Sequence, residues 1–140
     1  MKTILFKIFM TSMVAAFLFV ASPKADAKKK AAGGEAAIKF TEAVYDFGTI
    51  AEKKGPVSHD FEFINTGNGN LVIISATAEC GCTRPEYPKN PIAPGKKGKI
   101  KVTYNPLGRP GSFEKVVTVK TNGRPKKARI KIRGSVNPGK

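Results

Sequence analysis

The sequence has 140 residues and a formal net charge of +15, and 41% of its residues are hydrophobic. This length is enough for one modest domain and too short for two. Two cysteines and one histidine exclude a structural zinc site with four Cys or His ligands from one chain. The sequence also lacks a Gly-rich phosphate-binding loop, because "GKKGK" does not have the required spacing.

The first 27 residues have the pattern of a secretory signal peptide. Lys2 and Lys7 come first, an apolar stretch covers residues 8–21, and "ADA" at residues 25–27 matches a cleavage site. The alternative is an uncleaved membrane anchor, but about 14 apolar residues are fewer than the roughly 18–20 that span a bilayer. We therefore predict cleavage after Ala27, no transmembrane segment afterwards, and an extracytoplasmic location in the periplasm, on the cell surface or in the medium.

The charge of the predicted mature chain is unevenly distributed. Without residues 1–27, the chain keeps 22 basic and 9 acidic residues, a net charge of +13. Residues 31–83 carry a net charge of −4, whereas residues 84–140 carry a net charge of +14. Such a division predicts an oriented field that attracts anions to one part of the protein. The alternative is a solvated surface that Lys residues keep soluble.

The pattern of the remaining chain predicts strands and no helix. Residues 28–37, "KKKAAGGEAA", have no apolar periodicity and are interpreted as a flexible linker. Downstream, apolar alternation between Gly, Pro and Asn clusters predicts strands in "AIKF" running into "VYDFGTI" with a bend or bulge at Gly48, and in "VSHDFEFIN", "LVIISATA", "KIKVTYN", "SFEKVVTVKT" and "KKARIKIRGSV". We expect "LVIISATA" to be more buried, whereas Pro85, Pro88 and Pro91 exclude a regular central strand in their segment.

These elements predict an all-β fold for residues 38–137. About seven short antiparallel strands, each with one wet face, are typical of an immunoglobulin-like β-sandwich, with a small barrel as the alternative. The Cys…Trp…Cys pattern of antibody domains is missing, so no inter-sheet disulfide is expected. The expected core consists of the inward Ile and Val residues together with Phe40, Phe47, Phe61, Phe63, Tyr104 and Phe113.

Several motifs, taken in order, resemble the bacterial DUF1573 family. They are "YDFGTI", "FEFINTGNGNLVI", "AECGCTRP", "PIAPGKKGKIKVTYNP", "GSFEKVVTVKTN" and "IKIRG", and the resemblance covers roughly residues 40–136. The family is similar to the ASPM/SPD-2/hydin group of immunoglobulin-like domains. The resemblance implies a seven-stranded sandwich in an exported protein and a binding or scaffolding role. It does not imply an enzyme activity, because the family has no assigned function.

The segment "AECGCTRPEYP" contains Cys80 and Cys82, the two cysteines of the chain. Export makes a disulfide between them chemically possible, and Gly81 would ease closure of so small a ring. The alternatives are a reduced structural pair, a metal site completed by other ligands, thiol–disulfide catalysis and intermolecular pairing. Catalytic pairs usually have the spacing C-x-x-C at a helix N-terminus, which this segment lacks, and Arg84 is the nearest cation.

No arrangement of residues predicts catalysis or a cofactor. His59 is the single histidine, and it shares a predicted strand face with Phe61 and Phe63, so we expect a packed structural role. No carboxylate pair or nucleophile with a base is marked by a motif. We therefore predict a protein that is not an enzyme and needs no cofactor.

Basic residues on two predicted strands form the candidate anion-binding set. Lys99 and Lys101 alternate with inward residues on one strand, and so do Arg129, Lys131 and Arg133 on another. If the two strands share a sheet, their outer faces form one cationic surface, which the turn residues Arg109, Arg124, Lys126 and Lys127 extend. The alternative to anion binding is a structural role, because Lys on exposed strands protects sheet edges from aggregation.

The favoured function is an exported, non-enzymatic module that binds an acidic protein or an anionic envelope component through this basic half. A nucleic acid is not expected, because of the location and because no aromatic residues interleave with the charges. The alternative function is a thiol-redox or metal-binding protein centred on Cys80 and Cys82. The sequence makes no prediction of the oligomeric state.

Overall fold

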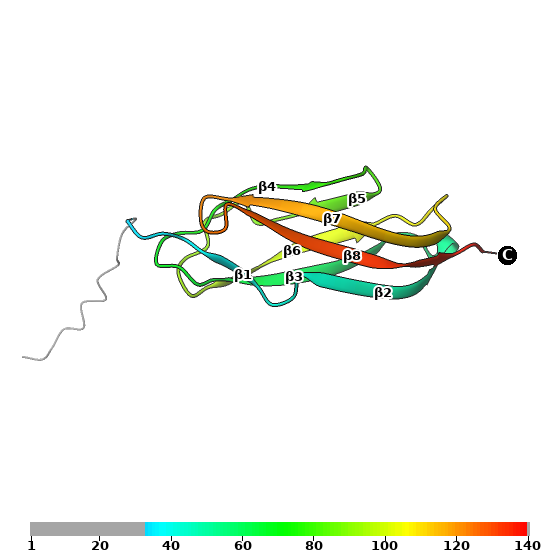
Figure 1. Ribbon diagram of the computed structural model, residues 1–140, viewed down its shortest axis with the longest axis horizontal. Helices are drawn as coiled ribbons and strands as arrows, with labels where there is room; N and C mark the ends of the chain where they lie inside the picture. The colour runs from blue at the N-terminus through cyan, green and yellow to red at the C-terminus, as the bar shows by residue number, and fades with distance from the viewer. Residues whose placement is uncertain (1–32, 140) are drawn as a thin grey trace, which may run out of the picture.

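Two four-stranded sheets pack face to face in the computed structural model, which describes residues 33–139 (Figure 1). One sheet has the strand order β1-β3-β6-β5, and the other has the order β2-β8-β7-β4. The elements in chain order are β1 (Ile38–Phe40), β2 (Val44–Ala51), the 3-10 helix η1 (Glu52–Lys54), β3 (Val57–Asn65), β4 (Ile73–Ala78), β5 (Thr83–Glu86), β6 (Lys97–Tyr104), β7 (Gly111–Thr121) and β8 (Lys127–Asn137). Within this range, no helix is long and apolar enough to cross a membrane.

The predicted all-β sandwich is confirmed, with two differences in its strands. The described residues form eight strands rather than about seven, because β5 forms in the proline-containing segment and the first predicted segment is divided into β1 and β2. Pro85 is tolerated there because β5 lies at a sheet edge, where a missing N–H need not break a ladder. The second difference is that β2 pairs with β8 in parallel, whereas all other strand pairs are antiparallel.

The first predicted strand is divided between the two sheets. β1 pairs with β3, and the chain then crosses to the other sheet, where β2 pairs with β8. The predicted irregularity at Gly48 is confirmed, since the register with β8 shifts between Asp46 and Thr49. Gly48 has φ 65°, a left-handed conformation that glycine adopts without steric cost.

The core lies between the sheets and contains most of the predicted side chains. Phe61, Phe63, Tyr104 and Phe113 are buried, and the Tyr104 and Phe113 rings stack with centroids 3.9 Å apart. Burial raises the pKa of the Tyr104 phenol, an effect that the nearby charge of Arg109 opposes. The other two predicted core aromatics, Phe40 and Phe47, are only partly buried and pack against the rim of the core.

The prediction that "LVIISATA" is a more buried strand is wrong. β4 is an edge strand that pairs only with β7, and the side of the sheet that faces away from the core is wet. Ile74 is therefore 59% exposed, although Leu71 and Ile73 are buried. The apolar run reflects the buried start of the segment rather than a central position in the sheet.

The predicted linker at residues 28–37 lies partly outside the described residues, and its last residues are not a free linker. Ala36 is 4% exposed and belongs to the core. The backbone pairs with the turn between β7 and β8, since Arg124 N donates to Ala36 O and Ile38 N to Arg124 O, both at 2.9 Å. Gly123 permits this approach, because a Cβ there would collide with the Ala36 carbonyl. The ordered domain therefore starts before Ile38.

A buried asparagine at the end of β3 joins this N-terminal segment to two turns. Asn65 is 0% exposed, and its Oδ1 accepts hydrogen bonds from Ala37 N at 3.2 Å and Gly67 N at 3.0 Å. Its Nδ2 donates to Gly69 O at 2.7 Å and Ile92 O at 2.9 Å. The amide thus uses two donors and two acceptors, its full ordinary capacity.

Candidate functional site

The two cysteines lie at the corner between β4 and β5, and their sulfurs are bonded to each other. Cys82 is buried in the core, Cys80 is partly buried, and Gly81 between them is exposed. Thr83 Oγ1 lies 3.9 Å from Cys80 Sγ and 3.7 Å from Cys82 Sγ. Of the arrangements that the sequence left open, the structure has the intramolecular disulfide.

The surroundings of the disulfide provide no metal donor set. Within residues 33–139, no group of three or more His, Cys, Asp or Glu side chains is placed to hold a metal ion. A cavity of about 260 Å³ beside the pair is lined by Cys82, Arg84, Glu86 and several uncharged residues. Chemically, the corner offers one largely buried disulfide, and Arg84 lines the same cavity as Cys82.

Reduction of this disulfide is expected to lower the free energy of unfolding by only about 1–2 kcal/mol. A bridge between residues 80 and 82 closes a very short loop, whereas a 15-residue loop is worth about 3 kcal/mol. Denaturant unfolding of the mature protein with and without reductant measures the difference. A variant with both cysteines changed to serine is the control and should not respond to reductant. A loss above about 3 kcal/mol would contradict the expectation.

His59 does not join the cysteines and packs between the sheets. Its ring stacks on Tyr45 with centroids 3.5 Å apart and meets the edge of Phe61. His59 Nε2 lies 2.5 Å from Glu42 Oε1. The structure therefore gives the histidine packing and hydrogen-bonding partners, in agreement with the expected structural role.

The condition for one cationic surface on two strands is not met, because β6 and β8 belong to opposite sheets. Lys99 and Lys101 point outward from one sheet, and Arg129, Lys131 and Arg133 point outward from the other. Alternation within a strand gives the direction of each side chain relative to the core. It does not say which sheet the strand joins, and this information was missing from the sequence.

Carboxylates offset the basic residues on the outer face of β6. Lys99 Nζ lies 2.8 Å from Asp60 Oδ2 on the neighbouring strand β3. This hydrogen bond raises the pKa of Lys99 and lowers the pKa of Asp60. Lys101 lies opposite Asp60 on β3 and opposite Glu86 on β5. This face is therefore mixed in charge.

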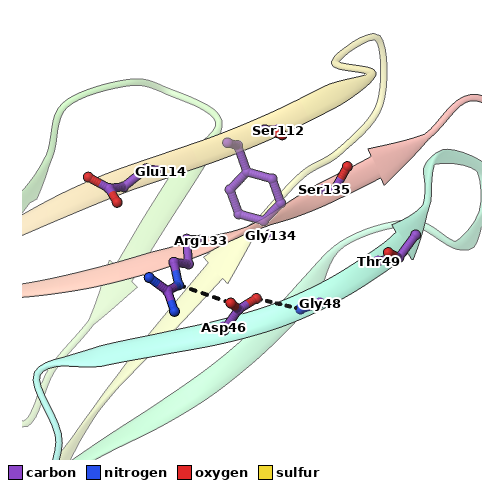
Figure 2. A pocket seen from close by; sticks show the side chains of 9 residues that line it. Asp46, Gly48, Thr49, Ser112, Glu114, Arg133, Gly134 and Ser135 are labelled. Atoms are coloured by element: carbon purple, nitrogen blue, oxygen red, sulfur yellow. Dashed lines mark hydrogen bonds and ion pairs between the residues drawn. The ribbon is translucent and has the colours of Figure 1, made fainter.

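The outer face of β8 is also paired, but only toward its C-terminal end. Arg133 Nε donates to Asp46 Oδ2 at 2.9 Å, and Lys131 Nζ lies 2.9 Å from Glu114 Oε1. The Gly48 backbone N–H, at 2.8 Å, and then Arg133 hold the pKa of Asp46 below its usual value. Figure 2 shows Arg133 and Asp46 joined across adjacent strands.

This paired region lines an open cavity of about 580 Å³ across β2, β8 and β7 (Figure 2). Besides the charged groups, three hydroxyl residues line it, and the strand register places them in one cross-strand row: Thr49, Ser135 and Ser112. Of the predicted anion-binding residues, only Arg133 lines this cavity, and its charge is already paired.

Four basic side chains gather at the other end of the same face, and we call them the basic end: Lys120, Lys126, Lys127 and Arg129. All are exposed, and none forms an ion pair with any residue in the described part of the chain. Lys120 of β7 lies directly opposite Lys127 of β8, and Arg129 lies opposite the uncharged Thr118. Like charges in opposite positions destabilise a sheet unless a counter-charge is supplied.

Two other predicted residues do not contribute an unpaired charge to the basic end. Arg124 lies in the adjoining turn and forms an ion pair with Glu35. Arg109 lies beyond the opposite end of β7, where its Nη1 donates to Leu107 O at 2.8 Å. The sequence prediction omitted Lys120, although Val117 and Val119 alternate inward and therefore direct Lys120 outward.

Comparison with known proteins gives a family and a fold. The model of a family described as "Protein of unknown function (DUF1573)" matches residues 38–136. No curated protein matches this sequence. Among solved structures, similarity extends to a protein of unknown function from Porphyromonas gingivalis W83, with a TM-score of 0.62 and 17% identity over 71% of this chain. The chain spans only 46% of that protein.

Two further structures have the same fold at low identity. The ASH / PapD-like domain 7 of human CEP192 gives a TM-score of 0.56 and 12% identity, covering 76% of this chain and 89% of that one. The YadV chaperone gives a TM-score of 0.50 and 15% identity, covering 71% of this chain and 52% of that one. At such identities the likeness shows the immunoglobulin-like, PapD-like sandwich alone.

Proposed function

This chain belongs to the DUF1573 family, and we propose that it is an exported, non-enzymatic binding module. Its ligand is an acidic protein or an anionic envelope component, which binds at the basic end. The family and the PapD-like sandwich are compatible with a binding role. The predicted signal peptide supports an extracytoplasmic location, where both kinds of ligand occur.

The unpaired charge of the basic end is the observation that carries the proposal. Elsewhere on the outer faces, Lys99, Lys131 and Arg133 each have a carboxylate partner within 3 Å. Lys101 lies opposite Asp60 and Glu86, whereas Lys39 and Lys97 lie opposite the uncharged Ile64. At the basic end, Lys120 and Lys127 face each other without one. A bound carboxylate or phosphate would relieve this repulsion, and Arg129 adds a guanidinium group that can hold such an anion with two hydrogen bonds.

Removal of these four charges is expected to weaken binding to the anionic fraction of an envelope extract at least tenfold at moderate salt. Each Lys or Arg beside an anionic surface contributes on the order of 1 kcal/mol. The test variant carries K120Q, K126Q, K127Q and R129Q, and binding is measured as the salt concentration rises. The steep salt dependence of the unchanged protein should become shallow in this variant.

A matched control removes the same charge elsewhere. It carries K39Q, K96Q, K97Q and K101Q, which affect exposed lysines on or beside the opposite sheet. We expect this control to keep nearly all of the binding. Equal losses in both variants would indicate a response to net charge alone, and no loss in the basic-end variant would refute the proposal.

A further inference from the structure

β4 has one register irregularity, between Ile73 and Ser75, but from Ser75 to Ala78 it pairs regularly with β7. In this part it differs from the other three edge strands of the described sandwich, each of which has a feature that blocks strand addition. β1 is only three residues long, β5 contains Pro85, and β2 is interrupted by the bulge at Gly48. Short length, proline and bulges are the usual means by which sheet edges avoid pairing with other chains. β4 has the sequence "IISATA", without proline, glycine or charge.

The outer side of β4 also has free backbone groups. Its inner side pairs with β7, and on the other side the Tyr87 hydroxyl donates to Ile74 O at 3.3 Å. Apart from the pairing with β7, no group in the described part of the chain hydrogen-bonds the backbone of residues 75–78. β4 forms the upper border of the molecule in Figure 1. An extended peptide can therefore reach this edge from the side.

The register connects the edge of β4 to the basic end. Ser75 lies opposite Lys120, which lies opposite Lys127, so the three form one cross-strand row. The next row contains Thr77, Thr118 and Arg129. An added strand would lie about 5 Å beyond β4 and so about 10 Å from β7. A glutamate on the added strand, beside the small Ser75, would lie on the same face of the sheet as Lys120. The long side chains of the glutamate and of Lys120 can together span the distance between the added strand and β7.

We propose that β4 accepts an extended acidic segment of a partner protein as a fifth strand of the β2-β8-β7-β4 sheet. The proposal rests on the proposed function, because the basic end supplies the attraction, and it names the partner as a polypeptide. Backbone hydrogen bonds to residues 75–78 fix the position of the segment. Its acidic side chains beside Ser75 and Thr77 provide specificity, because they lie near the basic end. A second copy of this chain fits poorly, since it brings four more unpaired cations and no carboxylate on its own β4.

The test uses a blocked synthetic peptide of about nine residues, with Glu at alternate positions and Val or Thr between them. Two matched peptides have the same sequence and carry N-methyl groups on alternate backbone amides. In one peptide the methylated amides lie along one edge of the extended strand, and in the other they lie along the opposite edge. N-methylation removes hydrogen-bond donors without changing the charge. We expect one methylated peptide to bind the mature protein at least about tenfold more weakly than the unmodified peptide, since several hydrogen bonds are lost. Amide exchange should slow within residues 75–78 when the unmodified peptide binds.

Vesicles that contain an anionic lipid provide the second probe and separate the two proposals. Suppose the vesicles bind the unchanged protein and not the basic-end variant, while the peptide either fails to bind or binds equally well when methylated. The added-strand proposal is then overturned, and the proposed function stands. If neither probe nor the envelope fraction responds to the basic-end variant, both proposals fail. Loss of peptide binding in the basic-end variant, together with sensitivity to methylation, supports both.

Discussion

Replacement of Asn65 by alanine should lower the free energy of unfolding by about 3–4 kcal/mol. The side chain is fully buried, and its amide satisfies the backbone groups of Ala37, Gly67, Gly69 and Ile92. Alanine would leave the N–H groups of Ala37 and Gly67 and the C=O group of Gly69 without this partner, and each unsatisfied buried group costs roughly 1–3 kcal/mol. The Ile92 carbonyl would keep its hydrogen bond from Leu71 N. Denaturant unfolding of the mature protein measures the loss.

Asn70→Ala is the matched control for this prediction. Asn70 is exposed in the segment that follows Asn65. Among residues 33–139, only its backbone oxygen has a partner, the Asn122 side chain at 3.0 Å. The control should change stability by less than about 0.5 kcal/mol. A similarly small effect of Asn65→Ala would mean that water replaces the lost hydrogen bonds and that the N-terminal segment does not depend on the amide.

Replacement of Tyr104 by alanine should cost about 3–5 kcal/mol. The ring is 1% exposed and stacks on Phe113, so alanine would open a cavity between the sheets. Because β6 pairs with both β3 and β5, the cavity would lie beneath a central strand that cannot easily move inward. The free energy of unfolding again provides the measurement.

Tyr104→Phe keeps the ring and removes only the hydroxyl group. This variant should lose less than about 1 kcal/mol, because packing provides most of the contribution of the side chain. Burial raises the pKa of the Tyr104 phenol, so this group titrates at high pH in the unchanged protein. The variant has no phenol at this position, and its ultraviolet absorbance should therefore lack that titration. A loss equal to that of the alanine variant would place the contribution in the hydroxyl group instead of the ring.

Local alternation was sufficient to predict the faces of the long strands. In β8, Ile130 and Ile132 are buried, whereas Arg129 and Arg133 are exposed, as their period of two requires. The same rule gave the inward row of β6 correctly. The ordered motifs also predicted the family and the sandwich, because turn residues and alternation occur together along nearly the whole domain.

Long-range pairing was not available from the same patterns. The rows of β6 and β8 look alike in the sequence, yet the strands belong to opposite sheets. Whether a lysine is paired depends on the strand beside it, and for Lys99 the partner Asp60 is 39 residues away. The candidate site therefore changed from one large cationic surface to a small unpaired group at the end of a single sheet.

The N-terminal segment shows the same limitation at a domain boundary. Small residues such as Ala36 carry no apolar pattern, so "AAGGEAA" has the composition of a linker. The partners of Ala36 and Ala37 are Asn65 and the turn at Gly123, which are distant in the sequence. Local composition cannot predict contacts with residues that are so distant in the sequence.

The parallel pairing of β2 with β8 determines how the domain responds to a pulling force along its strands. The described chain enters at one end of the long axis and leaves at the other (Figure 1). A pull on the two ends draws β2 and β8 in opposite senses along their length. The register pairs between them, from Val44 with Lys131 to Ala51 with Asn137, then bear the load together in shear rather than separating one after another. A module tethered at one end and loaded at the other would resist force along its strongest axis.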